Sequence, residues 1–142
     1  QLAMFVVYES PLTMVCDDPA AYRGQAGLAF LQQVATSWDE TRVLDGEIAE
    51  HITIARRNGS DWYLGAMTDW TPRQIRIPLA FLGNGRYEAD IYQDGPDADT
   101  QAVAERRARR RQVGTRCSRW SRNTCAARRQ PYGSGFRAIS VS

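Results

Sequence analysis

The sequence predicts a mixed fold, in which a helical N-terminal part precedes an antiparallel, all-β, sandwich-like domain. Apolar residues upstream of Trp38 recur near helical spacing, whereas from Ile48 onward they alternate with polar residues. Asn58-Gly59 supplies the positive φ of a tight hairpin between two strand-like runs. Turn-forming residues then recur about every ten residues, which is typical of a sandwich or a half-barrel.

The N-terminal part is expected to form helices. Residues 1–9 are densely apolar, and so short a run is compatible with either a helix or a buried strand. Ser10-Pro11 suits the N-cap and first position of a new helical turn. Residues 20–34 continue at helical spacing, although Gly24 and Gly27 weaken such a helix by about 1 kcal/mol each relative to alanine. We expect these helices to pack on protein that precedes this sequence.

The β-domain is expected to begin with a meander. Residues 51–57 and 62–68 alternate as strands do, and Asp45-Gly46 is expected to turn the chain before them. Residues 74–79 and 86–93 also alternate, the first of them as an edge strand because it contains a proline. Four or five short strands follow from this pattern.

Charge divides the chain near Glu105. Residues 1–104 hold seven arginines against fifteen acidic residues, and residues 105–142 hold eleven arginines against Glu105 alone. The like-charged block 106–111 is expected to stay solvated, although arginines with interleaved aromatic residues also suit nucleic-acid binding. Because a GC-rich gene read out of frame yields the same composition, we favour that interpretation over a basic arm. In this tail only residues 136–141 resemble a strand.

Composition argues against several classes of protein. One histidine and three cysteines without a CxxC pair argue against a zinc site. No apolar run reaches about 18 residues, so no membrane-spanning helix and no membrane partner are expected. The sequence opens in mid-pattern without an initiator Met, and we interpret Gln1 as an internal residue of a longer protein.

The residues that could take part in catalysis or binding lie after residue 37. Asp39 and Glu40 are adjacent carboxylates, and because adjacent strand residues point to opposite faces, they do not flank one bond as a glycosidase pair must. A solvated or structurally paired turn is the preferred interpretation. His51 has no nucleophile motif nearby and is expected to face solvent or a domain interface. The tryptophans suit sugar stacking, or packing in a core or an interface. The sequence therefore assigns no catalytic and no metal-binding residue.

Three runs of the sequence, in order and at matching spacing, resemble the C-terminal part of glycoside hydrolase family 97. They are WDET-x-x-LDG from Trp38, ARR-x-G-x-x-WY-x-G-x-MT-x-W-TPR from Ala55, and Y-x-A-x-x-Y-x-DG from Tyr87. The resemblance covers roughly residues 1–100, and the sequence departs from the family pattern after that point. Members of this family resemble α-glucosidases and α-galactosidases.

The resemblance implies a division of the chain. Residues 1–44 would be the last helices and closing strand of a (β/α)8 barrel, residues 45–104 the C-terminal β-domain, and residues 105–142 an arginine-rich tail that is disordered or out of frame. Active sites of such barrels lie at the C-terminal ends of the strands, so residues 38–42 are expected to approach the substrate or to brace the barrel. The candidates are Trp38, Asp39, Glu40 and Arg42.

The resemblance also implies an activity for the parent enzyme. That enzyme would hydrolyse α-glycosidic bonds of oligosaccharides with two carboxylates and calcium, in the periplasm or outside the cell. The residues involved would precede Gln1, so the present chain is expected to bind no calcium and to be inactive alone. Its own role would be barrel closure and self-association through exposed aromatic residues such as Tyr63, Trp70 and Tyr92. The alternative is a free-standing β-module that binds carbohydrate or, with its basic arm, nucleic acid; we do not expect nucleic acid as a partner.

Overall fold

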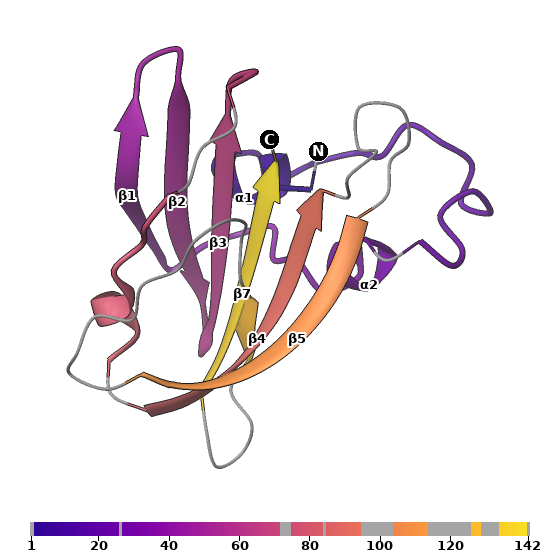
Figure 1. The fold of residues 1–142 in the computed structure, drawn as a ribbon. Coiled ribbons are helices and arrows are strands. Elements are labelled where there is room, and N and C mark those ends of the chain that lie inside the picture. The colour runs from indigo at the N-terminus through magenta and orange to yellow at the C-terminus, as the bar shows by residue number, and fades with distance from the viewer. Residues whose placement is uncertain are drawn as a thin grey trace.

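The computed structural model describes residues 2–25, 27–71, 75–83, 85–94, 104–113, 126–128 and 134–141. Two short helices, α1 (Met4–Val7) and α2 (Leu28–Leu31), precede the strands, and η1 (Leu79–Leu82) is a 3-10 helix (Figure 1). The strands are β1 (Glu40–Glu47), β2 (His51–Asn58), β3 (Asp61–Thr68), β4 (Gly85–Asp94), β5 (Ala104–Val113), β6 (Ala126–Arg128) and β7 (Ser134–Val141). Within these ranges, no helix has the length and apolar character needed to cross a membrane.

The strands in the described part of the chain all belong to one seven-stranded sheet with the order β1-β2-β3-β7-β6-β4-β5. Strands β1, β2 and β3 form an antiparallel meander, and β4 and β5 are also antiparallel. Strand β7 runs parallel to both β3 and β4 and so joins the two halves, and β4 and β5 curve strongly (Figure 1). The predicted antiparallel β-domain is thus present, and its meander occupies one edge of a larger mixed sheet.

The β2–β3 hairpin forms where the sequence predicts it. Asn58 pairs with Asp61 at its end, and Gly59 has a φ of 58°, a conformation that costs glycine least. The predicted turn at Asp45-Gly46 is wrong, because these residues lie inside β1 at a bulge. The chain turns instead at residues 48–50, and β2 begins at His51, where the predicted strand 51–57 begins.

Strand β1 crosses the predicted domain boundary after Leu44. Its residues Glu40 to Val43 pair with Arg57 to Ile54 of β2, and after the bulge Asp45 to Glu47 pair with Thr53 to His51. The pairing is antiparallel and continuous with the meander. Residues 40–44 therefore lie in the same sheet as the β-domain that follows them.

The N-terminal part contains less helix than the sequence predicts. Among the described residues of the range 20–34, α2 is the one α-helix, and Gly24 before it adopts a φ of 80° that an α-helix does not contain. The expected helical turn at Ser10-Pro11 is absent from the described structure, whereas residues 1–9 contain α1. Residues 75–78 form no strand either; Pro78 has no N–H to donate to a ladder, and η1 begins directly after it.

The arginine-rich tail contributes strands in the described ranges. Block 106–111 lies in β5, which pairs with β4 along its whole length. Ala104 lies opposite Asp94 at one end, and Val113 lies opposite Gly85 at the other. An edge strand needs only one neighbour, and the long β4 provides a backbone ladder that does not depend on side-chain type. These strands differ from the expectation of disorder in the tail, whereas the expectation that the tail is out of frame stays a prediction. Strand β7 confirms the strand-like pattern of residues 136–141.

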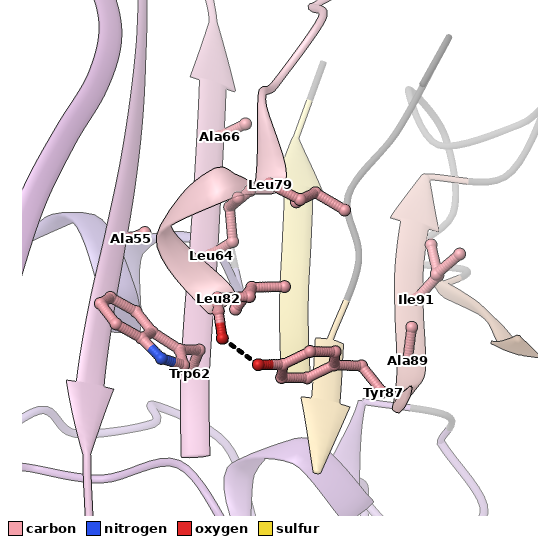
Figure 2. Close-up of a cluster of buried hydrophobic side chains, with 9 residues drawn as sticks. All are labelled: Ala55, Trp62, Leu64, Ala66, Leu79, Leu82, Tyr87, Ala89 and Ile91. Carbon is pink, nitrogen blue, oxygen red and sulfur yellow. Dashed lines mark hydrogen bonds between the residues drawn. The ribbon is translucent and has the colours of Figure 1, made fainter. Parts of the chain in front are cut away.

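Both faces of the sheet are covered. Successive strand residues point to opposite faces. On one face η1 packs over β3 and β4, and the Trp62 ring meets the Phe81 ring edge-on at 4.9 Å. On the same face the Tyr87 hydroxyl donates to the Leu82 carbonyl (Figure 2). The buried residues of this face are Ala55, Trp62, Leu64, Ala66, Leu79, Leu82, Tyr87, Ala89 and Ile91. On the other face α1 and α2 pack over a second cluster, formed by Ala3, Val6, Phe30, Tyr63 and Tyr92.

Candidate functional site

The predicted site segment lies at the entrance to β1. The Asp39 N–H donates to the Arg57 carbonyl at 2.8 Å, and Glu40 is the cross-strand neighbour of Arg57. The antiparallel register of β1 and β2 thus brings the two adjacent carboxylates to one arginine. Sequence reasoning assigned no role to Arg57, although it belongs to the ARR run.

Arg57 binds both carboxylates. Its Nη1 lies 3.2 Å from Asp39 Oδ2, and its Nε lies 3.2 Å from Glu40 Oε2. Arg42 Nε reaches the other oxygen of Glu40, Oε1, at 2.6 Å. Residues 40 and 42 are two apart on a strand and so share a face. One glutamate therefore accepts from two guanidinium groups, and these partly exposed pairs brace the first two strands.

Asp39 also closes the neighbouring turn. Its Oδ2 accepts the Gly59 N–H at 2.6 Å, and Arg57 Nη1 donates to the Gly59 carbonyl at 2.9 Å. Asn58 Nδ2 donates to the Ser37 carbonyl at 3.0 Å. The segment before β1 is therefore tied to the β2–β3 turn by side chains on both sides. Of the two predicted forms, a solvated or a structurally paired turn, this geometry agrees with the paired one.

The four predicted residues do not converge on one point. Trp38 packs edge-on against Tyr63 at 5.2 Å, on the face covered by α1 and α2. The Arg42 guanidinium lies 5.5 Å from the ring of Trp62, on the opposite face. The structure thus joins Asp39 and Glu40 through Arg57, joins Arg42 to them through Glu40, and places Trp38 elsewhere. Proximity of these residues to a substrate stays a prediction.

The two arginines change the acidity of Glu40. Hydrogen bonds from Arg42 and then Arg57 hold the pKa of this carboxyl below its ordinary value of 4.5. A carboxyl group whose pKa is lowered in the folded state stabilises the folded state at pH values above the pKa that the group has in the unfolded chain. The stabilisation is lost as the pH falls through the folded pKa.

The Glu40→Gln variant is therefore expected to have a lower Tm than the wild-type chain at pH 7, and the difference should shrink at pH values below about 4.5. Thermal unfolding followed by circular dichroism at stepwise decreasing pH measures this difference. Glu47→Gln, in the same strand but outside the arginine pairs, is the matched control. A Tm difference for Glu40→Gln that stays constant from pH 7 into acid would contradict this assignment.

A second cluster of titratable groups lies at the other end of β1. His51 Nε2 is 3.4 Å from Asp45 Oδ2, and ligand atoms of Glu47, Glu50 and His51 lie within 4.8 Å of one another. The His51 side chain is 14% exposed, so it is more enclosed than the sequence predicts. Calcium takes six to eight oxygen ligands in proteins, and two carboxylates with an imidazole fit this preference poorly. We assign calcium to none of the described residues.

The predicted interface aromatics divide into two groups. Tyr63 and Tyr92 are only 4% and 3% exposed, so the prediction that they are exposed is wrong. The Tyr63 hydroxyl donates to the Gln33 carbonyl at 2.9 Å, and Tyr92 packs edge-on against Phe30 at 5.6 Å. These two tyrosines are buried because α1 and α2 form a second layer over the face of the sheet on which they lie. Trp70, in contrast, is fully exposed.

These features define a class of protein: a small β-domain built on one mixed sheet, with a thin helical layer and a first strand braced by arginine–carboxylate pairs. The family described as "Glycosyl-hydrolase 97 C-terminal, oligomerisation" matches residues 37–126. The chain therefore belongs to the C-terminal domain family of glycoside hydrolase family 97, and the resemblance drawn from the three sequence runs is confirmed.

Individual relatives agree with this assignment. The chain is 46% identical over 99 residues to a retaining alpha-galactosidase of Bacteroides thetaiotaomicron, covering 69% of the chain and 15% of that protein. A glycoside hydrolase family 97 enzyme from Pseudoalteromonas sp. strain K8, solved in complex with panose, has a TM-score of 0.69 and 33% identity, over 97% of this chain and 22% of that enzyme. A beta-arabinopyranosidase gives a TM-score of 0.62 and 26% identity, over 80% of this chain and 17% of its own. The chain thus spans less than a quarter of each relative.

Proposed function

We propose that the chain is the C-terminal part of a glycoside hydrolase that cleaves α-glycosidic bonds in oligosaccharides. The observation that carries this proposal is the family match over residues 37–126. The 46% identity to a retaining alpha-galactosidase supports it, as do structures of a similar enzyme with panose and with acarbose. In this proposal residues 2–36 end a (β/α)8 barrel, and the apolar side chains that they expose, such as Leu12 and Met14, contact the rest of it.

The chain's own role in this proposal is structural. Asp39 and Glu40 hold arginines and a turn, an arrangement that braces the sheet and does not place two carboxylates across a scissile bond. The catalytic carboxylates and any calcium then belong to the preceding part of the enzyme. The family description supports self-association as a further part of the role. A periplasmic or secreted location fits a parent enzyme that acts on oligosaccharides.

Activity measurements on two proteins test this proposal. The 142-residue chain and the product of its reading frame extended upstream are incubated with p-nitrophenyl α-galactoside and p-nitrophenyl α-glucoside. The extended protein is expected to hydrolyse at least one substrate, and the chain alone neither. Hydrolysis by the chain alone would contradict its structural role, and an extended protein inert on both substrates would contradict the proposed enzyme class.

A further inference from the structure

Two loops meet at the end of the meander that lies away from the β2–β3 turn. We call them together the meander tip: residues 47–50, between β1 and β2, and residues 69–71, after β3. The Asp69 N–H donates to the Glu50 carbonyl at 2.7 Å, which joins the loops directly. Asp69 Oδ1 accepts the Thr71 N–H at 3.0 Å and so shapes the second loop. Both loops lie at the same end of the sheet (Figure 1).

The meander tip presents two large apolar side chains to solvent. Ile48 is 97% exposed and Trp70 is fully exposed, whereas the core residue Trp62 is 7% exposed. Burial of one such side chain is worth about 1.5–3 kcal/mol, so their exposure leaves a substantial stabilisation unused. Ala49, which follows Ile48 in the turn, has a φ of 64°, a conformation that residues with a Cβ rarely adopt. Strain of this kind often marks a functional loop.

We propose that the meander tip is the contact through which two copies of this chain associate, with Ile48 and Trp70 of each copy packing against those of the other across a two-fold axis. The inference rests on the self-association part of the proposed function and specifies its surface. A two-fold interface uses the same patch on both copies, so the patch must complement itself. Two uncharged side chains meet that condition, and exposed tryptophans are the residues that most often dominate binding energy.

The size and surroundings of the tip suit the centre of such an interface. A tryptophan and an isoleucine together offer on the order of 300–400 Å², about half of the ~800 Å² per partner in a standard interface. Three acidic residues of the same two loops, Glu47, Glu50 and Asp69, adjoin these side chains in the sequence, and polar residues are typical of the rim of an interface.

Because the tip carries acidic residues, the effect of salt distinguishes two possible contacts: with the same tip of a second copy, or with a basic surface of that copy. Carboxylates of two copies repel each other across the two-fold axis, and salt screens this repulsion while leaving apolar contact in place. Self-association through the tip is therefore expected to tighten when the salt concentration rises from about 0.05 M to about 0.5 M. Contact with arginine-rich segment 106–111 of another copy would weaken over the same range.

Sedimentation equilibrium of the full 142-residue chain tests the proposal. The wild type is expected to show a concentration-dependent dimer, and Trp70→Ser, which removes two tryptophans per dimer, is expected to raise the dimer Kd on the order of 100-fold. Ile48→Thr is expected to act in the same direction. Met14→Ser and Val43→Thr, at exposed apolar positions outside the tip, are matched controls and should change the Kd less than about threefold. Circular dichroism verifies that each variant is folded.

Each contrary outcome has one meaning. A wild type that is monomeric at every concentration overturns both the tip and self-association. A dimer that Trp70→Ser leaves unchanged, or that salt weakens, overturns the tip alone. Calorimetric binding of maltotriose or raffinose that Trp70→Ser abolishes would assign the tip to sugar and overturn the proposal. The enzyme class is tested separately by hydrolysis of the two glycosides.

Discussion

The Phe30→Ala variant is expected to lose about 3–5 kcal/mol of its free energy of unfolding. Phe30 is fully buried and packs edge-on against Tyr92, and it is the buried residue through which α2 contacts the sheet. A helix as short as α2 does not persist without tertiary packing. The substitution therefore leaves a cavity and also releases α2, the helix that carries residue 30, from the sheet. Urea unfolding followed by circular dichroism measures the loss.

The control for this prediction is Leu12→Ala, at an exposed apolar position of the same N-terminal part. Its expected effect is within about 0.5 kcal/mol, as for most surface substitutions. Equal losses in the two variants would mean that α2 does not stabilise the sheet.

The Gly65→Val variant is expected to be destabilised by about 1–3 kcal/mol, or more, through overpacking. A Cβ at Gly65 would lie 2.9 Å from Val6 Cβ and 3.1 Å from the Ala3 carbonyl oxygen. Ala3 and Val6 are fully buried, so neither has room to move away. The missing side chain of Gly65 is what allows α1 to lie directly on β3. Chemical unfolding and hydrogen exchange of the β2–β3 amides measure the effect.

Gly46→Ala is the matched control for this variant. Gly46 also lies in a strand, and the nearest atom to an added Cβ is the His51 carbonyl oxygen at 3.4 Å, an ordinary contact. Little change in stability is expected. A Gly65→Val variant as stable as Gly46→Ala would show that α1 does not approach β3 as closely as the structure has it.

The meander could be predicted from the sequence because its signals are local. Alternation over residues 51–57 and 62–68 and the Asn58-Gly59 turn depend only on neighbouring residues, and β2 and β3 form as predicted. The bulge in β1 escaped prediction, since Asp45-Gly46 has the composition of a turn and only pairing with β2 shows that it belongs to a strand. Strand β5 escaped for the same reason, because its ladder is supplied by β4.

The candidate site was predicted in part. A structural role for Asp39 and Glu40 could be anticipated, because adjacent strand residues point to opposite faces and so do not form a catalytic pair across one bond. Their partner Arg57 is 17 residues from Glu40 in the sequence, so its role depends on the register of β1 against β2. Sequence spacing alone does not specify that register.

By itself the sequence determined the β2–β3 hairpin and the family, because alternation, turn residues and ordered motifs are properties of the chain. Only the tertiary structure decided which side chains are exposed. Tyr63 and Tyr92 are buried because α1 and α2 cover a second face of the sheet, whereas Ile48 and Trp70 lie on loops beyond both covered faces. Burial depends on what packs against a residue, and in this protein the packing partners come from distant parts of the chain.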